Sequence, residues 1–153
     1  MSFLHLELAK EEDLLLIYNW VNDDSCRKNS FKQQKIELED HIVWYKNILN
    51  RQDILLYILY EDYNPLGQIR ITIEKGIATI SYSLDKNYRG QGYGEAILRM
   101  LEIKVIEEKL PITCLVGKVK YSNIASQKVF EKLGYINIKQ KNFIEYTKVL
   151  DQD

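Results

Sequence analysis

Apolar residues recur along the chain with two periods, so the pattern predicts both strands and helices. Apolar–polar alternation, or a short unbroken apolar run, predicts strands at 3–9, 54–60, 68–74, 77–84, 112–119, 135–139 and 143–150. Apolar residues three and four positions apart predict amphipathic helices at 11–20, 37–49, 95–109 and 123–133. Because the run 54–60 has no polar interruption, we expect that strand to be buried on both faces.

Turn-forming residues separate these elements and define their order. Residues 22–25 break the first helix, 30–35 lack any periodicity, and Lys75-Gly76 predicts a tight hairpin. The strand–helix–strand unit over 77–119 implies two parallel strands joined by a right-handed crossover. The predicted order is β-α-α-β-β-β-α-β-α-β-β, an α/β fold with a mixed central sheet in one domain, residues 1–153.

Composition excludes several classes of function. A length of 153 residues fits one domain, and 46% hydrophobic with 28% charged residues is ordinary for a soluble protein. The net charge of −1 predicts no nucleic-acid partner, and the short apolar runs predict no association with a membrane. The start of the chain shows no signal peptide. The few cysteines and histidines lack metal-type spacing, so we expect a reduced, cytoplasmic protein without a metal site.

The run Arg89-Gly90-Gln91-Gly92-Tyr93-Gly94 lies between a predicted strand and a predicted helix. Its three glycines permit positive φ angles and a close approach of the backbone to a ligand. The first amides of a helix have no intrahelical acceptor, and the helix dipole adds positive charge there. The run therefore predicts an anion site suited to phosphate. The alternative is a glycine-rich turn that only links strand to helix.

Residues 84–94 resemble the acyl-CoA-binding motif of the GCN5-related N-acetyltransferase (GNAT) superfamily, with Arg89, Gly92 and Gly94 at its defining positions. Asn123-Ile124-Ala125-Ser126, followed by Phe130 and Leu133-Gly134-Tyr135, resembles the second signature of that family. The element order agrees over essentially the whole chain. The resemblance implies a single N-acetyltransferase domain whose fourth and fifth strands are parallel and splayed apart.

The same resemblance implies where acetyl-CoA binds. The pantetheine would pair with backbone at the end of the fourth strand, the pyrophosphate would sit on amides of the glycine run, and Asn123 and Phe130 would flank the pantetheine arm. The implied cofactor-binding residues are Tyr82, Ser83, Leu84, Arg89, Gly90, Gln91, Gly92, Tyr93, Gly94, Glu95, Asn123 and Phe130. For Phe130, packing in the core is the alternative.

Acetyl transfer to an amine needs an uncharged amine, a polarised thioester carbonyl and a proton for the leaving thiolate. We expect a backbone N–H near Leu84 to stabilise the oxyanion. Phe130 stands where many relatives carry a tyrosine acid, and Thr79 and Lys118 stand where some carry a glutamate base. Deprotonation would then run through ordered water, or the amine would arrive neutral.

The phenol best placed in the sequence to act as the acid is Tyr121, at the exit of the fifth strand. The alternative is that Tyr121 is an exposed tyrosine without a catalytic role. Tyr82 is a weaker candidate because it falls in a strand that we expect to be part of the core.

The region 20–45 resembles acetyltransferases that modify the 4-amino group of nucleotide-linked deoxy-amino sugars in pseudaminic-acid-type pathways. In that interpretation Arg27 clamps a diphosphate and Trp20 or Trp44 stacks on a sugar or base, with Asn22 and His41 completing the acceptor site. The alternative is that the tryptophans pack the helices together. Acetylation of protein N-termini, acetylation of polyamines and a non-catalytic acyl-CoA-binding module stay open. The expected partner is a small-molecule amine, and the expected state a monomer or homodimer.

Overall fold

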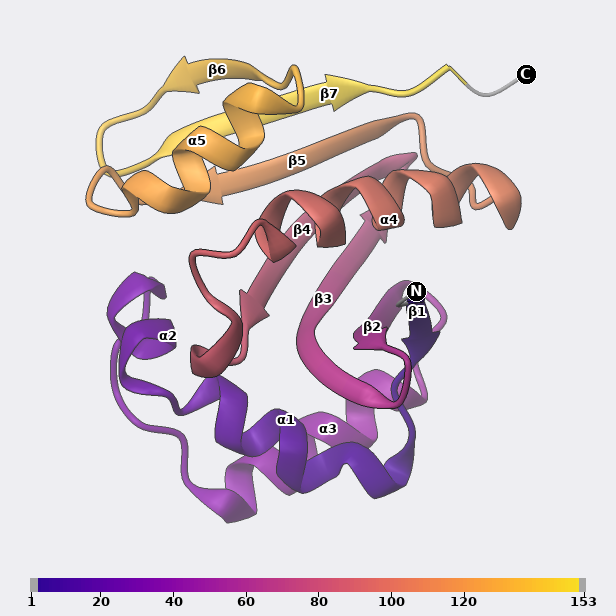
Figure 1. The fold of residues 1–153 in the computed structure, drawn as a ribbon, viewed down its shortest axis with the longest axis vertical. Helices are drawn as coiled ribbons and strands as arrows, with labels where there is room; N and C mark the ends of the chain where they lie inside the picture. The colour runs from indigo at the N-terminus through magenta and orange to yellow at the C-terminus, as the bar shows by residue number, and fades with distance from the viewer. Residues whose placement is uncertain (1–2, 152–153) are drawn as a thin grey trace.

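A mixed sheet of seven strands, in the order β1-β2-β3-β4-β5-β7-β6, organises the structure, a computed structural model that describes residues 3–151 (Figure 1). The first and last two positions of the domain predicted for 1–153 lie outside the described residues. In chain order the elements are β1 (Leu4–Leu8), η1 (Glu11–Asp13), α1 (Leu14–Val21), α2 (Asp24–Asn29), α3 (Leu38–Leu49), β2 (Ile54–Glu61), β3 (Asn64–Glu74), β4 (Ile77–Leu84), η2 (Lys86–Tyr88), α4 (Tyr93–Glu107), β5 (Cys114–Val119), α5 (Ile124–Lys132), β6 (Ile136–Lys139) and β7 (Ile144–Val149).

The strand pairing follows from the connections. Strands β1 to β4 form an antiparallel meander, and β3 turns into β4 through Lys75 and Gly76, both with positive φ. Strand β5 pairs in parallel with β4 because α4 carries the chain back across the sheet, and β7 then pairs antiparallel with β5. The predicted α/β architecture with parallel fourth and fifth strands is confirmed.

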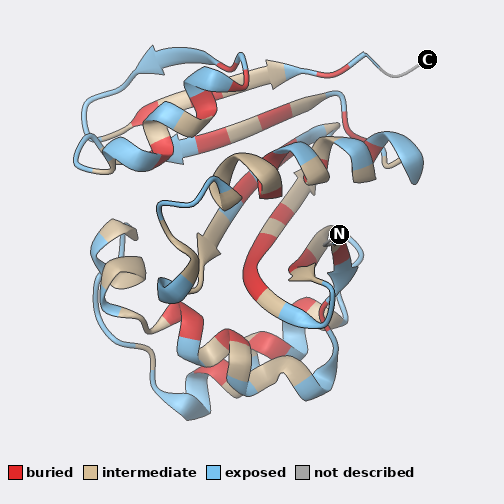
Figure 2. Cartoon of the chain, viewed as in Figure 1, coloured by how far each residue is buried: buried red, intermediate tan, exposed pale blue. Residues whose placement is uncertain are grey.

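Two hydrophobic clusters lie on opposite faces of the sheet (Figure 2). Helices α4 and α5 contribute to the larger cluster, and α1 and α3 pack over β2 to form the smaller one. Strand β2 belongs to both, since Tyr57 and Leu59 face the first cluster while Leu56 and Ile58 face the second. The expectation that the run 54–60 is buried on both faces is therefore confirmed at its centre.

One helix is absent from the predicted order. The residues predicted to break the first helix also begin α2, because the Asp23 side chain accepts from the backbone N–H of Cys26 at 3.2 Å and caps the new helix. A helix of six residues is too short to show an amphipathic period, so the pattern predicts two helices before β2 where the structure has three.

Candidate active site

A gap opens in the sheet where β4 and β5 stop pairing. The parallel ladder runs from Ile77 opposite Cys114 to Ile80 opposite Gly117, whereas β4 continues to Leu84. The ring of Phe130 packs against the backbone at this point: a Cβ added to Gly117 would lie 2.4 Å from the Cζ atom of Phe130. The strands therefore separate next to an aromatic ring that glycine alone accommodates.

The end of β4 presents backbone groups to this gap. The N–H of Asp85 donates to the carbonyl of Leu66 in β3 at 2.8 Å, and in an antiparallel ladder alternate residues face the same neighbour. Ser83 thus directs its backbone toward β3, while Tyr82 and Leu84 direct their N–H groups toward the gap. The predicted pairing of pantetheine is supported by this geometry at Tyr82 and Leu84 and not at Ser83.

The glycine run forms a loop that ends in the first turn of α4. Gly90 and Gly92 have φ angles of 73° and 89°, in the left-handed region that favours glycine. Gly92 caps a 15-residue helix that begins at Tyr93, two residues before the predicted start, and Ala96 donates to its carbonyl at 3.2 Å. The N–H groups of the three residues before Ala96 are therefore left without intrahelical acceptors and face outward together, as the anion site requires.

Gly94 differs from the other two glycines because its conformation is helical. A Cβ at Gly94 would meet side chains at ordinary contact distances, Val129 at 3.4 Å and Leu84 and Tyr82 at 4.0 Å. Since glycine within a helix is about 0.5–1 kcal/mol less favourable than alanine, packing within the chain does not explain it. The predicted close approach of a ligand is the explanation that the next experiment tests.

The Gly94→Ala variant separates these two explanations. We expect its free energy of unfolding to be unchanged or higher by up to about 1 kcal/mol, because alanine suits the helix better. Its affinity for acetyl-CoA should fall about tenfold, equivalent to about 1.4 kcal/mol, because the methyl group meets the pyrophosphate. Chemical denaturation and calorimetric titration measure the two effects, and an unchanged affinity would assign Gly94 no role in binding.

The side chains of the loop are engaged with the protein, which leaves its amides for a ligand. Arg89 forms an ion pair with Asp23 at 2.7 Å and donates to the carbonyl of Leu84 at 2.9 Å. Burial alone would raise the pKa of Asp23, but Arg89 and the amide of Cys26 hold that pKa below its usual value. Arg89 therefore ties the loop to α2 as a charged pair.

Three further side chains predicted to bind the cofactor are bonded to other groups of the protein. Gln91 donates to the carbonyl of Asn87 at 3.1 Å. Tyr93 donates to Glu61 at 3.1 Å, and Glu95 pairs with Arg99 at 2.8 Å and with Lys132 at 2.9 Å. A ligand at this loop would thus meet backbone rather than these side chains.

The start of α5 lies next to the side chain of Tyr82. Asn123 caps the helix by accepting from the N–H of Ser126 at 3.2 Å, and the Ser126 hydroxyl is 2.9 Å from the Tyr82 hydroxyl. Phe130, which is 2% exposed, contacts Tyr82 edge-on and stacks on Tyr146. Its Cζ atom faces Gly117, so Phe130 has the core role of the alternative and leaves no room for a hydroxyl there.

The hydroxyl of Tyr121 bonds to the connection between β6 and β7. Tyr121 follows the end of β5, and its hydroxyl donates to the carbonyl of Gln140 in that connection. This contact commits the proton of Tyr121 to the protein, so the geometry does not support the predicted acid role. Tyr82, from a strand that borders the gap, is the better-placed phenol; burial raises its pKa, and the hydrogen bond to Ser126 partly opposes that rise.

Two of the residues predicted to bind the acceptor are buried between the N-terminal helices. Trp20 is 6% exposed and its indole N–H donates to Asp85 at 2.9 Å. The Nε2 atom of His41 lies 3.0 Å from the carbonyl oxygen of Leu14, and burial lowers the pKa of His41. Trp20 therefore packs among the N-terminal helices, as the alternative for the tryptophans stated, and His41 holds α3 against α1.

Asn22 and Arg27 hold the segment between α2 and α3. The amide of Asn22 bonds in both directions with the backbone of Ile36, at 2.8 and 2.7 Å. Arg27 donates to the carbonyls of Val21 at 2.6 Å and Lys32 at 3.0 Å. With its guanidinium occupied in this way, Arg27 is not free to clamp a diphosphate. Of the predicted acceptor residues, Trp44 alone keeps a ring face directed at a side chain of the sheet.

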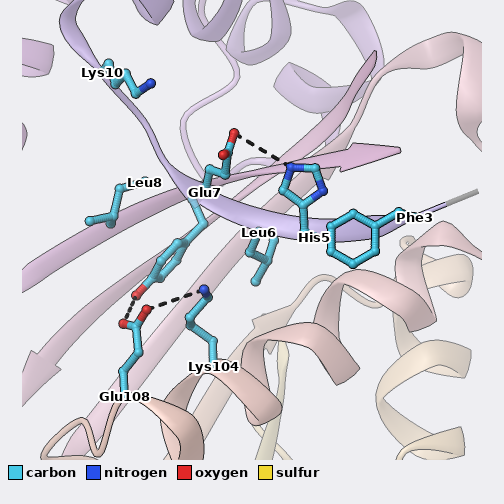
Figure 3. A pocket seen from close by; sticks show the side chains of 9 residues that line it. Phe3, His5, Leu6, Glu7, Leu8, Lys10, Lys104 and Glu108 are labelled. Atoms are coloured by element: carbon cyan, nitrogen blue, oxygen red, sulfur yellow. Dashed lines mark hydrogen bonds and ion pairs between the residues drawn. The ribbon is translucent and has the colours of Figure 1, made fainter. Parts of the chain in front are cut away.

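The larger of the two described pockets lies elsewhere, between β1 and the C-terminal half of α4 (Figure 3). Its volume is about 520 Å³, and among the residues that line it Glu108 accepts from the Tyr57 hydroxyl at 3.4 Å and pairs with Lys104 at 3.4 Å. A second pocket of about 330 Å³ separates α1 and α2 from Arg89. Three carboxylates line it, and each already has a partner. Asp23 pairs with Arg89, Asp24 pairs with Lys35, and Asp85 accepts from the indole N–H of Trp20.

Residues 3–151 contain no group of three or more His, Cys, Asp or Glu side chains that would hold a metal ion. Within the same residues no helix combines the length and the apolar character that crossing a bilayer needs.

Comparison with known proteins extends these observations. Residues 4–136 match the family described as the acetyltransferase (GNAT) domain. No curated protein matches the chain. Many solved structures do, and three of them illustrate the likeness. RimL, a ribosomal L7/L12 alpha-N-protein acetyltransferase in complex with coenzyme A, is 19% identical with a TM-score of 0.84, covering 98% of this chain and 96% of its own.

The other two are a spermidine N-acetyltransferase and an aminoglycoside acetyltransferase. The former, from Vibrio cholerae and in complex with CoA and spermine, is 12% identical with a TM-score of 0.86, covering 95% of each chain. The latter, AAC(6')-Ib in complex with ribostamycin and coenzyme A, is 18% identical with a TM-score of 0.81, covering 95% of this chain and 93% of its own. At these identities the likeness shows the fold.

Proposed function

The chain belongs to the GNAT acetyltransferase family and is an N-acetyltransferase that uses acetyl-CoA, and from this premise we propose its acceptor and the roles of its residues. The acceptor is a primary amine of a small molecule, specifically the 4-amino group of a nucleotide-linked deoxy-amino sugar. The observation that carries the donor side is the arrangement of two backbone sites, the free amides at the start of α4 and the N–H groups of Tyr82 and Leu84 at the gap.

These two sites set the direction of acetyl-CoA. The pyrophosphate sits on the amides of Tyr93, Gly94 and Glu95, where the helix dipole favours negative charge. The pantetheine arm follows the unpaired edge of β4 from Leu84 toward Tyr82, in place of the missing strand. The thioester then lies where the strands separate, near Gly117.

The reaction is a direct attack of the amine on the thioester carbonyl. An alkyl amine has a pKa near about 10 and must lose a proton first, and neither Thr79 nor Lys118 serves as a base. Ordered water takes that proton, and a backbone N–H at the end of β4 stabilises the oxyanion. As the C–S bond breaks, the thiolate receives the proton of the Tyr82 phenol, and the acetyl group stays on the nitrogen. The nitrogen, which carries two protons after the attack, releases one of them to water, and that proton restores the phenol of Tyr82.

The face of the sheet that carries α1 and α3 offers a polar surface beside the gap. Alternation along β4 places Thr79, Ser81 and Ser83 on this face, and Gln68 of β3 donates to the Ser83 hydroxyl at 3.2 Å. Hydroxyl and amide groups suit the hydroxyls of a sugar, and the indole of Trp44 suits its apolar face. This combination supports an amino sugar as the acceptor.

A peptide acceptor is the second candidate, favoured by the likeness to RimL, which is described as a protein acetyltransferase. A panel of amines separates the two, with release of the CoA thiol as the readout: a nucleotide-linked 4-amino sugar, the corresponding methyl glycoside, spermidine and an N-terminal peptide. We expect the nucleotide-linked sugar to have the highest kcat/KM. Reaction with the peptide alone would refute the sugar, and binding of acetyl-CoA without thiol release from any amine would favour a non-catalytic module.

A further inference from the structure

Arg70 is a cation without an anionic partner. It lies in β3, on the face of the sheet that α3 covers. Its guanidinium carbon is 5.3 Å from the centroid of the ring of Trp44, a residue of α3. Among the described residues its guanidinium forms neither an ion pair nor a hydrogen bond. Burial lowers the pKa of Arg70, an effect that the Cys26 thiol opposes, yet an arginine stays charged at neutral pH.

Arg70 lies one strand away from the gap, opposite the point where β4 stops pairing with β5. Arg70 is the cross-strand partner of Ser81, the first residue of β4 beyond the parallel pairing. On the other side of the gap, Lys118 follows the last paired residue of β5, and strand alternation places it on the same face of the sheet. Arg70 and Lys118 therefore stand on the two sides of the point where the strands separate.

Lys118 and its neighbour Lys120 also contact aromatic rings in place of carboxylates. The Nζ of Lys118 is 5.6 Å from the ring centroid of Phe143, and that of Lys120 is 5.8 Å from that of Phe31. The two rings meet edge-on at 5.8 Å, which joins the segment after α2 to the β6–β7 connection. Neither lysine belongs to an ion pair of the described residues, although Glu145 is the cross-strand partner of Lys118.

We propose that Arg70 and Lys118 bind a phosphate group of the acceptor, with Trp44 as the platform that holds the guanidinium in place. The proposal rests on the proposed function, since it takes the acceptor to enter the gap from the face of α1 and α3. Arginine offers a planar fork for two phosphate oxygens, and lysine adds a point charge. These residues replace Arg27, whose guanidinium is already occupied.

The cost of leaving Arg70 unpaired supports a ligand role. A partly buried charge without a compensating group is unfavourable, and the ring of Trp44 compensates it only in part. A phosphate would supply the missing charge. The same cations repel spermidine or an aminoglycoside, so this face selects against a polycationic acceptor.

Inorganic pyrophosphate, titrated into the chain saturated with CoA, tests the proposal. CoA occupies the amides of α4, so pyrophosphate is left to bind at the acceptor face, where it changes the fluorescence of Trp44 in a Trp20→Phe background. We expect Arg70→Gln to weaken its binding at least tenfold and Lys118→Gln about threefold. Arg70→Lys, which keeps the charge and loses the fork, should fall between Arg70→Gln and the parent chain.

Arg51→Gln is the matched control, because Arg51 is an exposed arginine whose charge is already paired with Asp53. Unchanged pyrophosphate binding in Arg70→Gln, or equal weakening in Arg51→Gln, would overturn the proposal, as would equally tight binding of succinate. Binding of CoA is measured separately. If the unsubstituted chain does not bind CoA, the proposed function is refuted. If it binds CoA and does not bind pyrophosphate, this inference alone is refuted. Thermal unfolding of each variant identifies a misfolded protein.

Once the acceptor is identified, a second measurement compares kcat/KM values for acceptors with and without the nucleotide. The nucleotide-linked amino sugar should have a kcat/KM at least a hundredfold above that of its methyl glycoside, and Arg70→Gln should reduce this ratio at least tenfold. A ratio that Arg70→Gln leaves unchanged would contradict recognition of phosphate by Arg70.

Discussion

Replacing Gly92 with valine is expected to abolish binding of acetyl-CoA while the fold survives. Gly92 has a φ of 89°, and a β-branched residue held in that conformation is strained by about 1–3 kcal/mol. The loop would relax that strain by rotating, and the amides of Tyr93 and Gly94 would lose their common direction. We expect the affinity measured by calorimetric titration to fall at least a hundredfold.

The fold should survive because the added side chain meets no other part of the protein. A Cβ at Gly92 has no neighbour within 4 Å, so the substitution introduces strain without a clash in the core. Gly76→Val is the matched control: Gly76 also has a positive φ, of 81°, but it lies in the β3–β4 turn at the opposite end of β4. We expect unchanged affinity from it and a destabilisation at least as large, because a Cβ at Gly76 would also lie 3.1 Å from the Oγ1 atom of Thr113. Retained affinity in Gly92→Val would reduce the glycine run to a turn.

Replacing Tyr82 with phenylalanine is expected to lower kcat about a hundredfold, within the usual contribution of a general acid. The substitution removes the phenol that projects from β4 and lies 2.9 Å from the Ser126 hydroxyl at the start of α5. Steady-state release of the CoA thiol measures kcat, and the affinity for acetyl-CoA should change less than about threefold because binding rests on backbone groups.

Two controls isolate the phenol. Ser126→Ala removes the same hydrogen bond and keeps the Tyr82 hydroxyl, so it should cost stability and little of kcat. Tyr121→Phe should leave kcat unchanged, because its hydroxyl donates to the carbonyl of Gln140. The opposite result, a slow Tyr121→Phe and a normal Tyr82→Phe, would return the acid role to Tyr121.

The dependence of kcat on pH gives an independent check on the acid. Burial raises the pKa of Tyr82 above its ordinary value near about 10, so the phenol stays protonated throughout the neutral and mildly alkaline range. We therefore expect kcat to rise with pH as the amine loses its proton, without a fall on the alkaline side below about pH 10. A fall near neutral pH would exclude Tyr82 as the acid.

Much of the fold could be predicted because its signals are local. The alternation of Ile69, Ile71 and Ile73 and the Lys75-Gly76 turn depend on residues a few positions apart, and both were correct. The glycine run likewise depends on the backbone conformation of consecutive residues, which the φ angles of Gly90 and Gly92 bear out. The missed helix α2 has only six residues, too few for a period to show.

The acceptor side was harder to predict because its contacts join residues distant in sequence. Trp20 bonds to Asp85 and Arg89 pairs with Asp23, across 65 and 66 positions, and no local pattern indicates either contact. Arg70 gave no signal of its own, since a charged residue in an alternating strand usually faces water. Only the packing of α3 on this face of the sheet brings it to the ring of Trp44.

The sequence by itself determined the order of the strands and of the longer helices, and the positive φ angles of the glycine run, because both follow from conformational preferences of neighbouring residues. The tertiary structure decided which side chains remain free for a ligand. A side chain such as Arg27, Trp20 or Tyr121 has the same chemistry wherever it lies, but its donors are used up once folding brings a carbonyl or carboxylate within hydrogen-bond distance. Arg70 keeps its charge available because folding supplies an aromatic ring instead.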